Sequence, residues 1–276
     1  MPELPEVELV TRTLNTLISG RKIVGAKLIR EKLAPHHTKV GFTKLIKGSK
    51  VNFAHRRGKH ILIDLNNERT LMVHLRMSGR FMLLPEEREL PKFTHAIFEL
   101  DNGERLVFQD QRHFGFMRIE KTSALPRAKE LVSLAPEPFS DEFSLEYFQG
   151  VISKSSRSLK EFLLDQTKVL GLGNIYACEA MFLAKVNPRK PANTVAKRKI
   201  EPLFMMIRQV LNESIRFSKK LRIDPENIDG SYFGGAHGNH WRVYDREGEQ
   251  CVECDAKIKR IPQGGRSTYF CPRCQR

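Results

Sequence analysis

The run Thr-His-Ala-Ile-Phe-Glu-Leu-Asp-Asn-Gly-Glu-Arg-Leu-Val-Phe-Gln at residues 94–109 predicts a β-hairpin. Short apolar runs flank Asp101-Asn102-Gly103, and such a tripeptide is typical of a tight turn between two strands. The same period of two extends from Lys22 to about Ile119, with further short runs at 60–65, 70–75 and 80–84. Consecutive short strands joined by turns favour an antiparallel sandwich or barrel.

Helices are predicted on both sides of this β region. Residues 5–19 place apolar side chains at helical spacing, with Pro5 at the start and Gly20 after the end. Beyond a proline-bearing stretch, helical patterns occupy residues 143–150, 158–165, 175–184 and 194–218, and a loop follows at 221–240. We therefore predict an α+β chain with domains at 1–130, 131–240 and 241–276.

The composition is that of a globular chain with an anionic partner. The 276 residues include 47 Lys and Arg against 32 Asp and Glu, a formal net charge of +15. Plentiful apolar positions exclude a disordered chain, and no stretch approaches the roughly 18 apolar residues of a membrane span. The acidic start, Met-Pro-Glu-Leu-Pro-Glu, is unlike a signal peptide, so we expect a cytoplasmic protein. Nucleic acid is the commonest partner of such a surplus of positive charge.

Four of the five cysteines lie in the last 26 residues, as two Cys-x-x-Cys pairs separated by 16 residues. This spacing predicts one structural Zn²⁺ held by Cys251, Cys254, Cys271 and Cys274. Two disulfides are the alternative, but no secretory signal accompanies them and the cytosol keeps thiols reduced. The fifth, Cys178, stands in an apolar helical stretch and is interpreted as a buried small residue.

Positive charge is concentrated in a few places. Between Lys32 and Ile63 there are eight Lys and Arg and no acid, and a second group comprises Lys154, Arg157, Lys160 and residues 189–198. Arg266 follows Gly264-Gly265 at the tip of the hairpin between the cysteine pairs. These cations are either a solvated surface or the walls of a cleft that holds a nucleic acid duplex through its phosphates.

The first eight residues carry three acids in a strongly basic chain. Glu3, Glu6 and Glu8 would stabilise a helix N-terminus by about 0.3–1 kcal/mol each, which is a purely structural explanation. A chemical explanation starts from Pro2. If Met1 is removed, Pro2 has a free secondary amine, which can attack an aldehyde-level carbon beside a glutamate acid.

Taken together, these features resemble the bacterial formamidopyrimidine-DNA glycosylases. The resemblance rests on Met-Pro-Glu-Leu-Pro-Glu-Val-Glu at 1–8, Arg-Gly-Lys at 57–59, Gly-Leu-Gly-Asn-Ile-Tyr at 171–176 and the four-cysteine finger with Gly265-Arg266. It covers the whole chain. It implies a β-sandwich domain with an N-terminal helix, a helix–two-turns–helix domain and a zinc ribbon. The implied activity is base-excision repair of damaged double-stranded DNA by a monomer that needs no small-molecule cofactor.

The resemblance also implies roles for individual residues. Pro2 would attack C1′ of the damaged nucleotide and form a Schiff base, with Glu3 as the neighbouring acid and base. Lys59 would assist base loss and β-elimination, and Arg266 would hold phosphates and assist δ-elimination. Glu6 would order the sugar pocket.

Other matching positions would contact DNA. Asn174, in the turn before a helix, would bind the backbone of the damaged strand. Met77, Arg112 and Phe114 would fill the gap left when the damaged base leaves the stack, although burial in the core is the alternative for Met77 and Phe114. The remaining expected DNA contacts are His95 and Lys154.

One stretch departs from the family pattern. Residues 217–240 lack the usual glycine-rich run and the loop that closes over oxidised guanine. Strand cleavage is therefore predicted more firmly than a preference for 8-oxoguanine and formamidopyrimidines. Two other functions stay open: an endonuclease VIII-like enzyme for oxidised pyrimidines, and a zinc-ribbon DNA-binding protein without catalysis.

Overall fold

The computed structural model describes residues 2–221, 223–229 and 241–276. The chain divides into two compact units, one comprising residues 1–132 and 217–237 and the other residues 133–216 and 238–276. This division differs from the predicted three domains. The ribbon shares a buried cluster with the helix at 174–183, and residues 225–228 pair with the β-sandwich.

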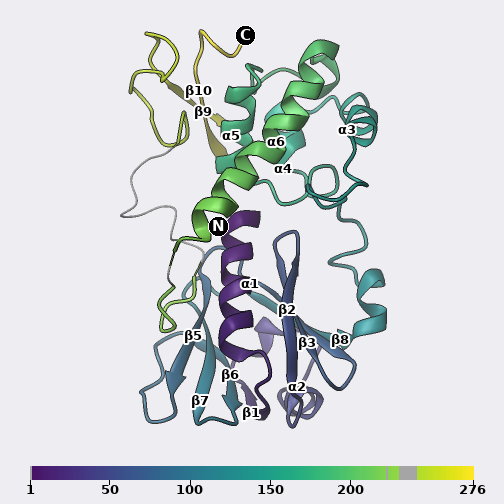
Figure 1. Ribbon diagram of the computed structural model, residues 1–276, viewed down its shortest axis with the longest axis vertical. Helices are drawn as coiled ribbons and strands as arrows, with labels where there is room; N and C mark the ends of the chain where they lie inside the picture. Colours follow the sequence, from purple (N-terminus) through teal and green to yellow (C-terminus); the bar gives the residue numbers. More distant parts are fainter. Residues whose placement is uncertain (1, 222, 230–240) are drawn as a thin grey trace. The chain divides into compact units, whose positions relative to one another are not determined.

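The first unit is a sandwich of two antiparallel sheets behind an N-terminal helix, as predicted (Figure 1). One sheet has the order β1-β6-β7-β5 and the other β2-β3-β4-β8. The chain runs through α1 (Leu4–Ile18), β1 (Ile23–Leu28), α2 (Lys39–Ile46), β2 (Val51–Arg57), β3 (His60–Leu65), β4 (Arg69–His74), β5 (Gly79–Pro85), β6 (Thr94–Leu100), β7 (Glu104–Asp110) and β8 (Phe116–Lys121), with short 3₁₀ helices at Glu31–Leu33 and Thr122–Arg127.

The hairpin that predicted the sheets is present. Glu99 of β6 pairs with Arg105 of β7, and Gly103 between them has a φ of 77°, which a side chain would disfavour. One part of the strand prediction is wrong: residues 39–46 are the helix α2. Its N-cap Thr38 accepts the N–H of Gly41, and its buried Phe42 and Ile46 stand at helical spacing, a signal that the period of two concealed.

The core of the first unit lies between the two sheets and under α1. The helix contributes Val7, Val10, Leu14 and Ile18, which follow the predicted helical spacing. Residues 223–229, predicted as loop, cover an edge of the first sheet instead. Ile228 is fully buried and exchanges two backbone hydrogen bonds with Phe81 of β5, at 3.0 and 2.8 Å. The rest of the predicted loop, 222 and 230–240, lies outside the described residues.

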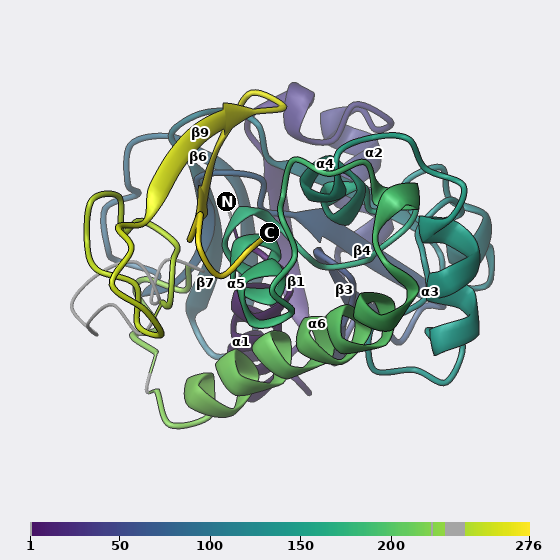
Figure 2. The ribbon, with the colours of Figure 1, turned by 90° about the horizontal axis from the view of Figure 1, so that it is seen from above.

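The second unit is helical with a two-stranded ribbon. Its elements are α3 (Leu145–Ile152), α4 (Leu159–Leu164), α5 (Asn174–Leu183), a 3₁₀ turn at Ala192–Thr194, α6 (Lys197–Ser218), β9 (Lys259–Gln263) and β10 (Arg266–Phe270). The four predicted helices are confirmed within a few residues at each end. β10 packs against α5 (Figure 2). In the described part of the chain, every helix is too short or too polar to cross a bilayer.

Two histidines in the first unit make its stability sensitive to acid. Burial lowers the pKa of His60 to about 4 and that of His74 to about 2, and their rings meet edge to face at 4.7 Å. Both imidazoles are neutral in the folded chain, whereas the unfolded chain protonates them below about pH 6.5.

We therefore expect the free energy of unfolding to be highest above pH 6.5, where both histidines are neutral in the folded and the unfolded chain. It should fall as the pH drops toward 4, by about 2 kcal/mol per histidine at pH 5. Urea melts at a series of pH values measure this slope. His60→Gln should reduce this slope by about half, because His74 still contributes the rest. An unchanged slope in His60→Gln would contradict the assignment.

Candidate functional site

The N-terminus places two buried carboxylates beside Pro2. Glu3 and Glu6 are 2% and 3% exposed, and the Glu6 carboxylate accepts the backbone N–H of Glu3 at 2.8 Å. This bond is part of a capping box, so the residues that start α1 also fix its first turn. Pro2 is half-buried in front of that turn, and Met1 lies outside the described residues. The structural and the chemical explanations of these acids are therefore compatible.

Lys59 lies in the tight turn between β2 and β3, after Gly58 with a φ of 57°. The lysine is only 5% exposed, which is unusual for this residue type. The β2–β3 hairpin packs against α1, and Arg56 on β2 donates to Glu8 on α1 at 2.7 Å. The basic run is therefore not wholly unopposed by acids. The structure brings the hairpin that carries Lys59 onto the helix that begins beside Pro2.

Two loops of the first unit carry the residues expected to enter DNA. The wedge loops, as we call residues 75–79 and 111–115, connect β4 to β5 and β7 to β8 and so cross from one sheet to the other. Because β4 pairs with β8 and β5 with β7, the two loops lie next to each other. Met77 is 46% and Phe114 54% exposed, which excludes the core interpretation of both. The Arg112 guanidinium lies 5.3 Å from the Phe114 ring centre. An exposed apolar and cationic group thus stands at one end of the sandwich.

His95 lies behind these loops. It is 5% exposed, and its Nε2 is 2.8 Å from the Asp110 carbonyl oxygen and 2.9 Å from His113 Nδ1. Burial lowers the pKa of His95, so the neutral form is favoured. Its side chain thus contacts Asp110 at the end of β7 and His113 in the loop 111–115, and a direct contact with DNA stays a prediction.

In the second unit, the glycine-rich turn leads into α5 as expected. Asn174 is the first residue of that helix, and its side-chain N–H donates to the Ser267 carbonyl of β10 at 2.9 Å. Arg266 starts β10, exposed, after Gly264 and Gly265 with φ values of 56° and 71°. The turn and the ribbon tip are thus tied together, which neither motif showed alone.

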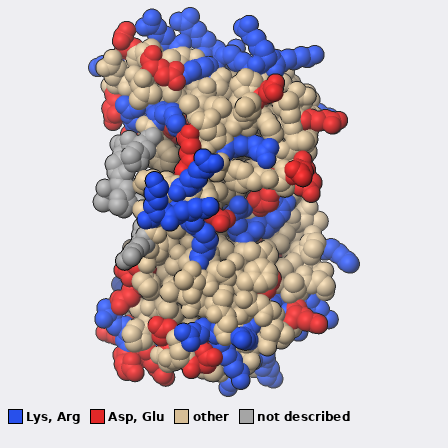
Figure 3. Space-filling model, in the orientation of Figure 1, with Lys and Arg blue, Asp and Glu red and all other residues tan. Residues whose placement is uncertain are grey.

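The second predicted basic group needs one correction. Lys154 is exposed just after α3, and Arg157 is exposed and 3.5 Å from Asp165. Lys160, however, is fully buried on the inner face of α4. Its Nζ donates to Cys178 Sγ at 3.3 Å and to Thr268 Oγ1 at 3.1 Å, so it binds α4 to α5 and the ribbon rather than a phosphate. Other Lys and Arg side chains gather at the end of this unit that is uppermost in Figure 3.

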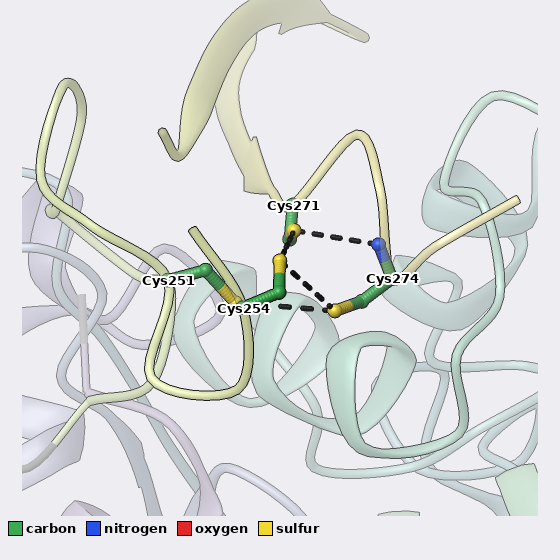
Figure 4. A group of neighbouring side chains, drawn as sticks. All are labelled: Cys251, Cys254, Cys271 and Cys274. Atoms are coloured by element: carbon green, nitrogen blue, oxygen red, sulfur yellow. Dashed lines mark hydrogen bonds between the residues drawn. The ribbon is translucent and has the colours of Figure 1, made fainter. Parts of the chain in front are cut away.

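The four ribbon cysteines converge, as Figure 4 shows. Their Sγ atoms lie within 4.8 Å of one another, with separations of 3.6 Å from Cys254 to Cys271 and to Cys274, and 4.0 Å from Cys251 to Cys274. Tetrahedral Zn²⁺ with Zn–S bonds of about 2.3 Å requires sulfur separations of about 3.8 Å. A disulfide requires about 2.05 Å, so the alternative pairing is excluded. The residues fit one structural Zn²⁺, whose four protein ligands leave no position for a substrate.

Sequence reasoning missed two buried carboxylates. Glu179 on α5 is fully buried and accepts the backbone N–H groups of Arg242, Val243 and Tyr244 at 2.9–3.1 Å, which holds the segment before the ribbon. A charged residue in the apolar stretch 177–182 was the available signal. Asp110, at the end of β7, is also fully buried, and its alternating strand pattern gave no warning.

Comparison with protein families divides the chain into three matched regions. Residues 1–117 match the model of the formamidopyrimidine-DNA glycosylase N-terminal domain, residues 134–224 its H2TH domain, and residues 248–276 a zinc finger found in FPG and IleRS. The predicted helix–two-turns–helix motif around Asn174 falls in the second of these regions and the four cysteines in the third.

Relatives and solved structures match over their whole length. The formamidopyrimidine-DNA glycosylase of Pelotomaculum thermopropionicum is 39% identical over all of this chain and 99% of its own, and that of a Bradyrhizobium species is 40% identical over all of both chains. The crystal structure of Lactococcus lactis Fpg with DNA containing an abasic site superposes with a TM-score of 0.90, at 31% identity over 99% of both chains. A complex of the wild-type Lactococcus enzyme with DNA containing an oxidised pyrimidine gives 0.90 at 32% over all of both chains.

Proposed function

The chain belongs to the formamidopyrimidine-DNA glycosylase family, and from this premise we propose that it excises oxidised purines from double-stranded DNA and then cleaves the strand. The observation that carries this proposal is the N-terminus, where two buried carboxylates adjoin a proline that the removal of Met1 would convert to a secondary amine. The capping box accounts for both acids structurally, so it is the potential amine of Pro2 next to them that favours catalysis over DNA binding alone.

In the proposed reaction, the neutral amine of Pro2 attacks C1′ of the damaged nucleotide. The bond from C1′ to the base breaks, and its electron pair leaves with the base, which takes up a proton. Opening of the sugar ring then gives an iminium ion between Pro2 and C1′, which acts as an electron sink. Glu3 lies next in the chain and would donate and accept the protons of these steps, while Glu6 would order the sugar.

Strand cleavage follows from the same iminium ion. Loss of a proton from C2′ expels the 3′ phosphate by β-elimination, and a second elimination expels the 5′ phosphate. We assign assistance in base loss and the first elimination to Lys59, and in the second to Arg266. Support comes from the packing of the Lys59 hairpin on α1 and from the exposed place of Arg266 at the ribbon tip. Zn²⁺ supplies only the folding of the ribbon.

The remaining predicted residues would hold DNA in the bent and opened form that base removal requires. We assign Met77 and Phe114 to the gap in the stack and Arg112 to the base opposite it. Asn174 and Lys154 would bind the backbone of the damaged strand. His95, which lies beside the loop 111–115, would contact the DNA. The exposed fractions of Met77 and Phe114 support the first of these assignments.

The lesion preference is proposed on narrower grounds. A Lactococcus Fpg variant forms a complex with DNA containing Fapy-dG, whereas the wild-type Lactococcus enzyme forms one with DNA containing an oxidised pyrimidine, so these complexes do not separate the two lesion classes. The curated relatives carry the name of the purine-directed enzyme, and this favours 8-oxoguanine and formamidopyrimidine as substrates. We place the enzyme, as a monomer, in the cytoplasm of a bacterium, where thiols stay reduced for zinc.

A panel of duplexes tests the proposal. Each carries 8-oxoguanine, formamidopyrimidine or thymine glycol opposite each of the four bases, and single-turnover excision is followed by strand cleavage on gels. We expect both purine lesions to be cut at least about tenfold faster than thymine glycol, a difference of about 1.4 kcal/mol in barrier. Faster cutting of thymine glycol would establish the endonuclease VIII-like alternative. Binding without any cleavage would establish the non-catalytic one.

A further inference from the structure

The buried carboxylate of Asp110 is bonded to both wedge loops. The residue is 0% exposed at the end of β7. Its Oδ1 accepts the Ser78 hydroxyl at 2.5 Å and the backbone N–H of Arg112 at 3.2 Å, and its Oδ2 accepts the N–H of Gly115 at 2.6 Å. One carboxylate therefore reaches the loop 75–79 through Ser78 and both ends of the turn 112–115 directly.

Ser78 completes the connection from the other side. Its hydroxyl donates to Asp110 and at the same time accepts the backbone N–H of Arg112 at 3.0 Å. The loop with Met77 is thus joined to the loop with Arg112 and Phe114 by a short chain of hydrogen bonds. Bonds to an ionised carboxylate are stronger than bonds between neutral groups, especially where water is excluded.

The backbone around these bonds leaves little freedom. Arg76 and His113 have φ values of 56° and 61°, a left-handed conformation that non-glycine residues adopt only when their surroundings impose it. Both loops also pass close over the Phe108 ring. A Cβ at Gly79 or at Gly115 would lie 2.8 Å from that ring, so neither position admits a side chain without displacement of the core.

We propose that Asp110 and Ser78 are positioning residues that hold the two wedge loops as one rigid body. Their work is to keep Met77, Arg112 and Phe114 in the relative arrangement that fills the gap left by the everted base. This inference rests on the proposed function. Asp110 itself would not contact the substrate. The hydrogen bonds of Asp110 and Ser78 to the two loops, which we call the clamp, would affect eversion of the base and not the chemistry at C1′.

The inference separates two activities. Excision from a duplex requires eversion of the damaged base, so its rate depends on the wedge loops. Displacement of reacting or positioning groups by about 1 Å can lower a rate by about 10²-fold. Cleavage at an abasic site already formed in a single strand requires no eversion and no filled gap. Loss of the clamp should therefore slow the first activity and spare the second.

The experiment compares Asp110→Asn, Ser78→Ala and Ser78→Thr in the full chain. The substrates are a duplex with 8-oxoguanine opposite cytosine, or whichever duplex lesion the wild type excises fastest, and a single strand with an abasic site. We expect duplex excision to fall by about 30- to 100-fold in Asp110→Asn and about tenfold in Ser78→Ala. Ser78→Thr keeps the hydroxyl and should restore the rate. Single-strand cleavage should stay within about twofold of wild type throughout.

A fluorescent base, 2-aminopurine, next to the lesion reports eversion directly. Its signal should rise more slowly in Asp110→Asn and Ser78→Ala, and the double variant should be no slower than Asp110→Asn, because both changes remove one connection. Thr70→Ala and Asp64→Asn are matched controls, since they break a hydroxyl–carboxylate bond of the same 2.5 Å length in the same unit, away from the wedge loops.

Equal loss of both activities, or no loss of duplex excision, would overturn the inference. The inference would also be overturned if Thr70→Ala or Asp64→Asn slowed duplex excision while leaving single-strand cleavage unchanged. Should Asp110→Asn fail to fold, the comparison of Ser78→Ala with Ser78→Thr decides alone. A wild type that cleaves neither substrate would instead overturn the proposed function, and the clamp with it.

Discussion

An N-terminal extension before Pro2 is expected to abolish borohydride trapping of this chain on abasic DNA, a loss of at least about 10³-fold. The reason is chemical. In the extended chain the Pro2 nitrogen belongs to an amide, whose lone pair is delocalised, so it cannot attack C1′. Trapping is measured as the covalent protein–DNA band on a denaturing gel, with equal amounts of protein and DNA.

The control uses the same protein. A protease site placed directly before Pro2 allows the extension to be removed, and trapping should then return to the level of the native chain. Mass spectrometry of the native chain shows whether Met1 is absent. If the extended chain traps as well as the cleaved one, the amine has been misassigned. Lys59, the buried amine on the hairpin that packs against α1, is then the group to replace.

Removal of zinc is expected to unfold the ribbon and to lower strand cleavage at least about tenfold. Structural zinc contributes roughly 10 kcal/mol or more to the folding of such sites, and loss of the charged Arg266 contacts alone would cost about 1.5–3 kcal/mol. Cys254→Ser removes one ligand and should reproduce the effect of a chelator. Zinc content is measured by elemental analysis, and folding by thermal melts.

Cys178→Ala is the matched control, because Cys178 is a cysteine of the same cluster, which joins the ribbon to α5, but is not one of the four converging cysteines. It should keep its zinc, although the loss of the contact with Lys160 should lower the melting temperature. Loss of zinc should also disturb the packing of α5, because Cys251 and Cys271 share a buried cluster with Phe182 of that helix. Unchanged cleavage by zinc-free Cys254→Ser would show that the ribbon does not position Arg266.

Local patterns predicted much of the fold. The turn 101–103 and the apolar runs around it identified the hairpin, and the cysteine spacing identified the metal ligands, because in both cases neighbours in the sequence are neighbours in space. The helix α2 was missed because its eight residues include only two buried positions, too few to oppose the surrounding strand pattern.

Interactions between segments that are far apart in the sequence could not be predicted from local patterns. Lys160 was counted with surface cations because its burial depends on α5 and β10, which the sequence of α4 does not report. Asp110 and Ser78 are 32 residues apart, and only the pairing of β5 with β7 brings them together. The positions of candidate site residues could be named from motifs, whereas the groups that hold them in place could not.

The backbone bonds between Ile228 and Phe81 bear on the order in which the chain is made. A ribosome that has released residues 1–132 has delivered both sheets, but not the segment that pairs with β5. Until residue 228 has been synthesised, the backbone groups at the free edge of β5 are unpaired and the core lacks Ile228. An exposed strand edge of this kind can pair with a strand of another chain. The sandwich is therefore completed only after the helices of the second unit have been synthesised and before its ribbon is made, and a fragment ending at residue 132 would lack the segment that pairs with β5.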